Sequence, residues 1–266
     1  MPPFIIEPAA LHTIMQSDEI LLIDLSSRTT FENHHLSAAI HVAPQDIVSG
    51  IKPAPGKLPD IDRLNKLFSK IGYSEDKHIV AYDDEGGGWA GRFLWTLDII
   101  GHQKMSYLNG GIHAWLASEL PTSTEIIVPT PSECDLSLNL KFKANQAEVM
   151  ASLDDDNCVI WDARSLEEYL GTKVLSARAG RIPGAIHFEW TDAMDPNKQL
   201  RIREDISEVL TKLGITKNKK VITHCQSHHR SGFTYIIGKS LGYDIRAYDG
   251  SWSEWGNDPT TPIEQG

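Results

Sequence analysis

The sequence predicts an α/β protein made of two tandem domains, each with a mainly parallel sheet flanked by helices. Three observations support this fold class. The 266 residues suit two domains of about 120–130 residues, each large enough to bury a core. Similar segments recur in the same order in the two halves. Short apolar, β-branched runs alternate with helical patterns, which is typical of α/β units.

The internal repeat is the most specific of these observations. Each half contains a strand that ends in Asp, an Ala-Ile-His segment, a second strand with a polar loop, and a closing segment with glycine and tryptophan. The copies are separated by roughly 140 residues. The matching positions are Asp24 with Asp162, His41 with His187, Asp83 with Cys225, and Gly110 with Gly250.

A linker is expected between the two copies. The segment PTSTEIIVPTPSECDLSLNLKF is rich in Pro, Ser and Thr and has no helical periodicity. We therefore predict an N-terminal domain over residues 1–124, a linker over 125–143 and a C-terminal domain over 144–266.

The expected elements follow the same order in both domains. The predicted strands are the apolar runs at 21–25, 79–82, 159–163 and 220–224. The predicted helices are 61–72, 203–214 and a third that starts at Ser231 or Gly232 and ends at Gly242. Each of these helices ends at a glycine, which is a common helix stop. Gly232 is expected to allow a close approach of another backbone.

Composition excludes several classes of function. The net charge of −11 and the absence of a basic run argue against nucleic acid as a partner. No stretch approaches the ~20 apolar residues that span a bilayer, so no membrane segment is expected. The first residues, MPPFIIEPAALHTIM, lack the basic start of a secretory signal, which favours the cytoplasm. Three scattered cysteines are too few for a disulfide framework.

The stretch VITHCQSHHRSGFT at 221–234 carries the chemistry. It places Cys225 after a predicted strand and before a helix N-terminus, where open α/β sheets bind ligands. Unpaired helix amides and the neighbouring His228, His229 and Arg230 form surroundings that stabilise a thiolate. We therefore expect Cys225 to be a nucleophile and the loop amides to hold an anion. His224, on the strand side, is expected to be a packed residue.

Two other interpretations of this loop are weaker. A metal site would need His224, Cys225, His228 and His229 to point inward from one tight loop, so no metal and no cofactor are expected. Cysteine phosphatases and some arsenate reductases place five residues between Cys and Arg. Here only four residues separate Cys225 from Arg230, which gives a smaller ring of amides than the one that holds a phosphate in those enzymes.

With these residues in view, the chain resembles the rhodaneses, or thiosulfate sulfurtransferases, and in particular the tandem-domain bacterial type. The resemblance covers nearly the whole chain. It rests on ARAGRIPGAIHFEW, LNGGIHAW, YDGSWSEW, DDEGGGWAGRFLW and the loop Cys225-Gln226-Ser227-His228-His229-Arg230. That loop is similar to the Cys-Gln-Thr-His-His-Arg loop of one bacterial type, with Ser227 in place of Thr.

The resemblance implies a sulfurtransferase. Cys225 would take the outer sulfur of thiosulfate as a persulfide and pass it to cyanide or a thiol, with a protein acceptor also possible. The loop from Gln226 to Arg230 would bind the substrate, and Trp190 would lie near it. Only the C-terminal domain would be catalytic, because Asp83 stands at the nucleophile position of the first copy. Two fused copies favour a monomer.

Departures from the family pattern bear on the substrate. Mercaptopyruvate sulfurtransferases, the alternative, have a different loop and a histidine from the N-terminal domain, whereas PAPGKLPD here contains none. Vertebrate rhodaneses have an arginine before Tyr-Leu-Gly, where this chain has Glu168. We expect that Arg178 or Arg181 compensates for that arginine.

Overall fold

The computed structural model describes residues 2–266 and contains two five-stranded parallel sheets. The first has the order β1-β5-β4-β2-β3, and the second has the order β6-β12-β11-β7-β8. Corresponding strands of the two sheets occupy the same places, so the repeat in the sequence is a repeat in topology. A separate antiparallel pair, β9 with β10, belongs to the second half. The predicted fold class, two domains with mainly parallel sheets and flanking helices, is confirmed.

The strands are short and centred on apolar runs. Those of the first sheet are β1 (Ile5–Ile6), β2 (Ile20–Asp24), β3 (Ile40–His41), β4 (His78–Tyr82) and β5 (Met105–Leu108). Those of the second half are β6 (Lys143–Ala144), β7 (Cys158–Asp162), β8 (Ile186–His187), β9 (Met194–Asp195), β10 (Arg201–Ile202), β11 (Lys220–His224) and β12 (Asp244–Tyr248). Their apolar side chains are buried because helices cover both faces of each sheet.

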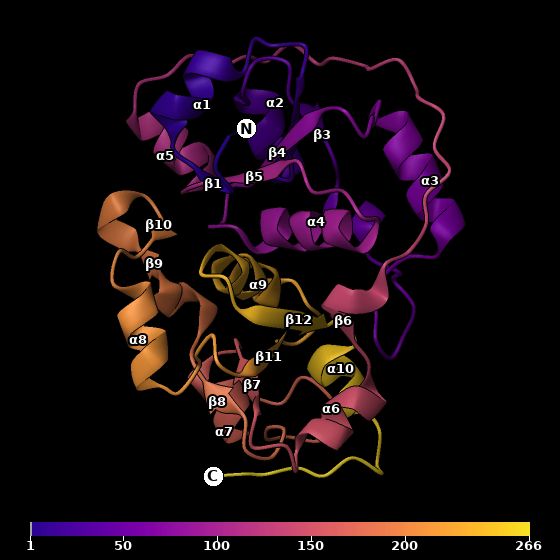
Figure 1. The fold of residues 1–266 in the computed structure, drawn as a ribbon, viewed down its shortest axis with the longest axis vertical. Coiled ribbons are helices and arrows are strands. Elements are labelled where there is room, and N and C mark those ends of the chain that lie inside the picture. Colours follow the sequence, from indigo (N-terminus) through magenta and orange to yellow (C-terminus); the bar gives the residue numbers. More distant parts are fainter. Residues whose placement is uncertain (1) are drawn as a thin grey trace.

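Helices connect the strands and cover the sheets (Figure 1). The first half contains α1 (Pro8–Ile14), α2 (Arg28–Asn33), α3 (Ile61–Lys70), α4 (Gly88–Ile99) and α5 (Gly111–Ala117). The second contains α6 (Gln146–Ser152), α7 (Leu166–Leu170), α8 (Ile206–Lys212), α9 (Arg230–Ser240) and α10 (Ser251–Trp255). Short 3₁₀ turns lie at Pro44–Ile47, Leu140–Phe142, Trp190–Ala193 and Pro196–Lys198. Helix α9 begins at Arg230, whereas the sequence predicts a start at Ser231 or Gly232.

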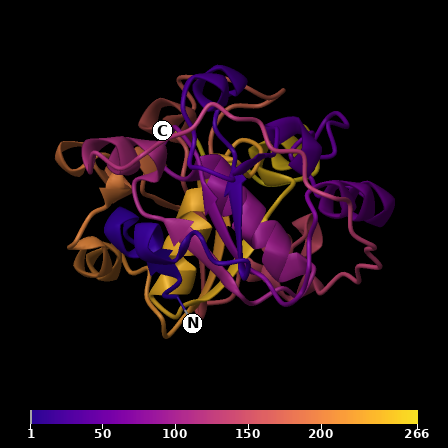
Figure 2. The ribbon, with the colours of Figure 1, turned by 90° about the horizontal axis from the view of Figure 1, so that it is seen from above.

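Helices α4 and α9 hold the two domains together at the centre of the molecule (Figure 1). Eleven of the twelve residues of α4 are buried, because its own sheet covers one side and α9 the other. One apolar cluster contains side chains from both domains, including Phe93 of α4 and Phe233 of α9. In Figure 2, seen from above, the first domain lies in front of the second. The domains therefore form one body with a continuous core.

The segment between the domains crosses the surface. Residues 125–139 contain no helix or strand and are mostly exposed or half-buried. Ser132 anchors the segment, since its carbonyl accepts a 2.5 Å hydrogen bond from the Ser69 hydroxyl of α3. Its last residue by our prediction, Lys143, is already the first residue of β6.

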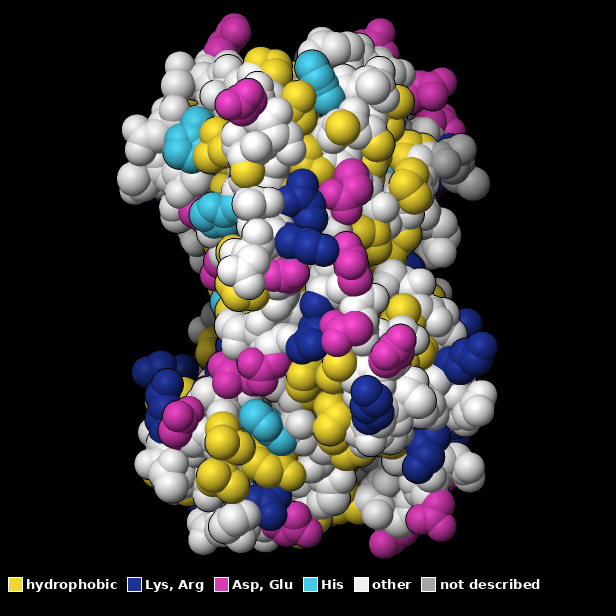
Figure 3. All heavy atoms as spheres, turned by 90° about the vertical axis from the view of Figure 1, so that its left-hand side faces the viewer, with side chains coloured by type: hydrophobic (Ala, Val, Ile, Leu, Met, Phe, Trp, Pro, Cys, Tyr) yellow, Lys and Arg dark blue, Asp and Glu magenta, His cyan; other side chains and the backbone are white. Residues whose placement is uncertain are grey.

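No large surface of a single charge is visible on the face in Figure 3, where basic side chains lie among acidic ones. Within residues 2–266, none of the helices is both long enough and apolar enough to pass through a bilayer.

Candidate active site

Cys225 lies at the carboxyl end of the central strand β11, in the loop that leads into α9. Its side chain is almost completely buried, at 1% exposure. The loop carbonyls are held from outside, because the amides of Trp252 and Ser253 in α10 donate to the carbonyls of Cys225 and Gln226 at 3.0 and 2.9 Å. With the carbonyls turned away, loop amides are free to face the sulfur. The amides of Ser227 and Ser231 hydrogen-bond the sulfur, and their binding of an anionic substrate stays a prediction.

The surroundings of Cys225 favour its thiolate. Burial raises the pKa of Cys225, whereas the positive charge of Arg230 lowers it. The Ser231 hydroxyl, 3.5 Å from Sγ, and the amides of Ser227 and Ser231 lower it further. The balance holds the pKa of Cys225 below that of an ordinary thiol. At Cys158, burial raises the pKa instead.

Arg230 forms a bidentate ion pair with Glu168 of α7, with Nη1–Oε2 and Nη2–Oε1 distances of 2.6 and 2.8 Å. Burial raises the pKa of Glu168, but Arg230 more than offsets this, so the carboxylate is ionised. The charge of Arg230 is therefore partly neutralised by protein. No spacing or motif in the sequence predicts this pairing.

The expectation for Arg178 and Arg181 is not supported. The guanidinium of Arg178 donates to the Thr261 and Trp255 carbonyls, each at 2.8 Å. Arg181 pairs with Glu264 at 3.2 Å. Both arginines thus fasten the C-terminal segment to the second domain, and Glu168 instead pairs with the loop arginine itself.

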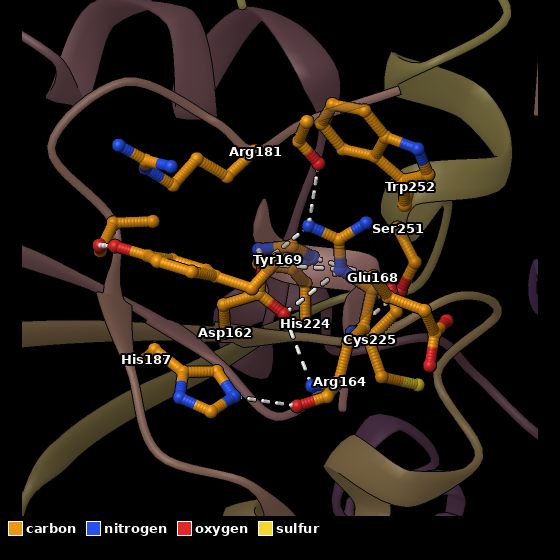
Figure 4. A network of polar contacts seen from close by, with 12 residues as sticks. Asp162, Arg164, Glu168, Tyr169, Arg181, His187, His224, Cys225, Ser251 and Trp252 are labelled. Atoms are coloured by element: carbon orange, nitrogen blue, oxygen red, sulfur yellow. Dashed lines mark hydrogen bonds and ion pairs between the residues drawn. The ribbon is translucent and has the colours of Figure 1, made fainter. Parts of the chain in front are cut away.

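A buried polar network supports the base of the loop (Figure 4). Arg164 donates to both oxygens of Asp162 and lies over the Trp252 ring, 4.4 Å from its centre. His224 Nε2 lies 3.5 Å from Asp162 Oδ2. Although burial raises the pKa of Asp162, His224 and Arg164 lower it to about 2. His224 is a packed residue, as predicted, whereas the roles of Arg164 and Trp252 were not foreseen.

The first domain closes one side of the loop. Gly56 packs so tightly against Ser227 that a Cβ there would overlap its backbone. The His229 ring stacks on Trp89 of α4, with centroids 4.2 Å apart, and its Nε2 contacts the Glu85 carboxylate. These contacts connect Ser227 and His229 of the loop to the other domain.

The remaining predicted residues surround Cys225 in different ways. The Gln226 amide points outward, since its Nε2 donates to Ser176 Oγ at 3.1 Å. The side chain of His228 is fully buried, and its backbone has a positive φ of 54°. Its Nδ1 lies 2.8 Å from Ser231 Oγ. Trp190 lies beside the loop, 5.6 Å from the His229 ring centre. Its position agrees with the expectation, and its contact with substrate stays a prediction.

The equivalent loop of the first domain closes around Asp83. One oxygen of this carboxylate accepts from the amides of Glu85, Gly86 and Gly87 at 2.8–3.2 Å, and the other accepts from Ala90 at 3.0 Å. Burial and the charge of Glu85 raise the pKa of Asp83 to about 6, although the amides oppose this. The first copy thus holds its own carboxylate in the amide cradle.

The His and Cys side chains of the loop are also of the types that bind metal ions. Across the part of the chain that the structure describes, no group of three or more His, Cys, Asp or Glu side chains is arranged to hold an ion.

The fold and the site define an α/β protein with a buried cysteine in an amide-lined loop, the class that includes sulfurtransferases and cysteine phosphatases. Within that class, the chain belongs to the rhodanese family. The family model described as "Rhodanese-like domain" matches residues 7–118 and 145–258. Each match contains one of the two parallel sheets apart from its short edge strand β1 or β6.

Relatives support the same assignment over the full length. The chain is 49% identical to the thiosulfate sulfurtransferases of Azotobacter vinelandii and Pseudomonas aeruginosa, covering 98% of this chain and 97% of each relative. It is 30% identical to the sulfur carrier protein TtuD of Thermus thermophilus, covering 77% of both.

A solved structure shares the fold. The anaerobic ergothioneine biosynthesis enzyme of Chlorobium limicola matches with a TM-score of 0.88 and 20% identity, over 99% of this chain and 70% of that chain. At this identity the likeness concerns the fold alone.

Proposed function

We propose that this protein is a thiosulfate sulfurtransferase that works through a persulfide on Cys225. The observation that carries the proposal is the buried Cys225 sulfur in an amide-lined loop, with a pKa held below that of an ordinary thiol. The names of the relatives that match nearly the full chain support thiosulfate as the donor.

The reaction has two steps in this account. The Cys225 thiolate attacks the outer sulfur of thiosulfate, the S–S bond breaks, and sulfite leaves with the bonding electron pair. Cyanide or a thiolate then attacks the terminal sulfur of the persulfide, and Cys225 leaves as a thiolate. The amides of Ser227 and Ser231 stabilise the sulfur's negative charge in both states, as oxyanion-hole donors do in acyl transfer.

Other loop residues bind and orient the substrate. Arg230 attracts the dianion with a charge that Glu168 moderates. His229 and Trp190 form a wall beside the loop, supported by Trp89 of the first domain. His228 holds the Ser231 hydroxyl toward Cys225 from beneath.

The first domain is non-catalytic in this proposal. Its boundaries are residues 1–124, with the linker at 125–143 and the catalytic domain at 144–266. Asp83 fills the amide cradle at the position of Cys225, and a carboxylate cannot carry a persulfide. The first domain supplies instead one wall of the site.

The cellular compartment, the oligomeric state and the sulfur acceptor are inferred from less direct observations. The three cysteines are unpaired, which suits the reducing cytoplasm. The shared core between the fused domains suits a monomer. The likeness to a sulfur carrier protein supports a protein thiol as one acceptor.

Thiocyanate formation from thiosulfate and cyanide tests the proposal. Cys225→Ala should abolish it, whereas Cys134→Ala and Cys158→Ala should keep it, with folding checked by circular dichroism. Parallel assays with 3-mercaptopyruvate and an aryl phosphate address the alternatives. Substantial activity in Cys225→Ala, or a clear preference for either other substrate, would overturn the proposal.

A further inference from the structure

Arg92 of α4 is buried between the two domains with most of its hydrogen-bonding capacity unused. The side chain has 0% exposure. Its Nη2 donates to the Ile47 carbonyl at 3.0 Å, but Nε and Nη1 have no partner within residues 2–266. Burying a guanidinium with free donors costs free energy, so packing alone gives no reason to keep it there.

The crossing of α4 and α9 places Arg92 next to the active-site helix. At the crossing the backbones of Gly91 and Gly232 touch, and a Cβ on Gly232 would overlap the backbone nitrogen of Arg92. Gly232 follows Ser231, whose hydroxyl is 3.5 Å from Cys225 Sγ. A residue of the first domain thus lies against the first turn of α9, the helix that follows the Cys225 loop.

A continuous set of contacts leads from Arg92 to the sulfur. The guanidinium lies over the Trp95 ring, 4.6 Å from its centre. The His228 ring meets the same Trp95 at 4.6 Å, nearly perpendicular to it. His228 Nδ1 is 2.8 Å from Ser231 Oγ, which in turn donates to Cys225 Sγ.

The direction of these hydrogen bonds follows from proton counting. The Ser231 hydroxyl has one proton, which it gives to Cys225, so His228 Nδ1 must donate to the Ser231 oxygen. Burial and the nearby positive charge of Arg92 hold the pKa of His228 well below its usual value. His228 is therefore neutral, with its proton on Nδ1.

Other cations that act on Cys225 or His228 are neutralised by carboxylates. Arg230 pairs with Glu168, as described above, and Lys143 pairs with Asp249 at 2.8 Å. Arg92 makes no ion pair within residues 2–266. Burial lowers the pKa of Arg92 to about 10, while Asp249 and Cys225 raise it. It stays protonated at neutral pH, and Asp249 and Cys225 are the acidic groups whose charge favours its protonated form.

We propose that Arg92 is a positioning residue for sulfur transfer, supplied by the non-catalytic domain. Its buried positive charge stabilises the negative charge on Cys225 and keeps His228 in the tautomer that turns the Ser231 hydroxyl toward the sulfur. The inference rests on the proposed function, because it takes Cys225 as the nucleophile. It gives the first domain a part in the chemistry beyond covering the site.

The test is the pH dependence of Cys225 alkylation by iodoacetamide, in a background where Cys134 and Cys158 are Ala. Arg92→Met should move the midpoint up by roughly one pH unit, because removal of a nearby buried positive charge leaves the thiolate less stabilised. Sulfur loading from thiosulfate should slow at pH values below the wild-type midpoint, by up to roughly ten-fold. Arg92→Lys keeps the charge and should stay within a few tenths of a unit of the wild type.

Two further variants separate this role from a structural one. Lys239→Met removes another interdomain cation, which contacts Asp98 at 2.6 Å, and should leave the midpoint unchanged even if Tm falls. Arg92→Gln retains a donor for Ile47 and should show the same upward shift as Arg92→Met, so it serves if the Met variant does not fold. A wild-type midpoint in a folded, neutral Arg92 variant overturns the inference. A wild type that takes no sulfur on Cys225 overturns the proposed function instead.

Discussion

Glu168 and Arg230 share two hydrogen bonds, of 2.6 and 2.8 Å, beside the Cys225 loop. Glu168 is 2% exposed, so the pair lies in a region where charges are weakly screened. The carboxylate orients Arg230 and also subtracts from the positive charge available to an anionic substrate. The strength of thiosulfate binding should therefore depend on both residues.

Glu168→Gln should strengthen thiosulfate binding. The amide can still accept a hydrogen bond from Arg230, but the negative charge near Cys225 is gone. We expect KM for thiosulfate to fall by roughly three- to ten-fold, the effect of about 0.6–1.4 kcal/mol. Steady-state kinetics checks this, with the exposed neighbour Glu167→Gln as the matched control. A KM that is unchanged or higher in folded Glu168→Gln would mean that the carboxylate serves orientation only.

Arg230→Ala should reduce both activity and stability. A hydrogen bond to a charged group contributes about 1.5–3 kcal/mol, so kcat/KM should fall by roughly ten- to a hundred-fold. Glu168 would be left buried without its partner, which should lower Tm. Arg230→Lys keeps the charge without the bidentate geometry, so its kcat/KM should lie between those of the wild type and Arg230→Ala. If Arg230→Ala retains wild-type kcat/KM, backbone amides alone bind the anion.

The first half-reaction should persist well below the pKa of an ordinary thiol. The thiolate is the reactive form, and the folded protein holds the pKa of Cys225 below its usual value. The rate of sulfur loading should therefore rise with pH to a plateau whose midpoint lies below the pKa of an ordinary thiol. Below that midpoint the thiol is protonated and the rate is lost. Stopped-flow measurement of loading against pH checks this, and a midpoint at or above the pKa of free cysteine under the same conditions would contradict it.

Gly232→Ala should destabilise the contact between the domains. Helix propensity alone predicts a gain of about 1 kcal/mol from this change. The added methyl group, however, would overlap the backbone of Arg92 and Gly88 in α4, which cannot move aside cheaply. Gly238→Ala is the matched control in the same helix, because its methyl group would meet only the flexible Ile245 side chain. Thermal unfolding should show a lower Tm for Gly232→Ala than for Gly238→Ala, and the reverse order would contradict the packing argument.

Local patterns in the sequence predict most of the fold. Apolar runs bounded by turn residues give the strands on either side of Cys225, and the repeat gives the matching sheets. The glycine at 232 also behaves as expected, since it allows α4 to approach. The strand, loop and helix around Cys225 are encoded within about twenty consecutive residues.

The contacts that tune the site were harder to predict. Glu168 and Arg230 are 62 positions apart, and Glu85 and His229 are 144 apart in different domains. No spacing or periodicity encodes such pairs, because they depend on how the domains pack. The composition of α4 does indicate that this helix packs against another element on each side. A helix that is apolar on all sides, as GWAGRFLWTLDI nearly is, must be covered on both faces.

The central claim is that Cys225 carries the transferred sulfur. Intact-protein mass spectrometry before and after thiosulfate tests it most directly. The wild type should gain the mass of one sulfur atom, peptide mapping should place it on Cys225, and cyanide should remove it, while Cys225→Ser gains nothing. A wild type that gains no sulfur, or an equal gain in Cys225→Ser, would contradict the account.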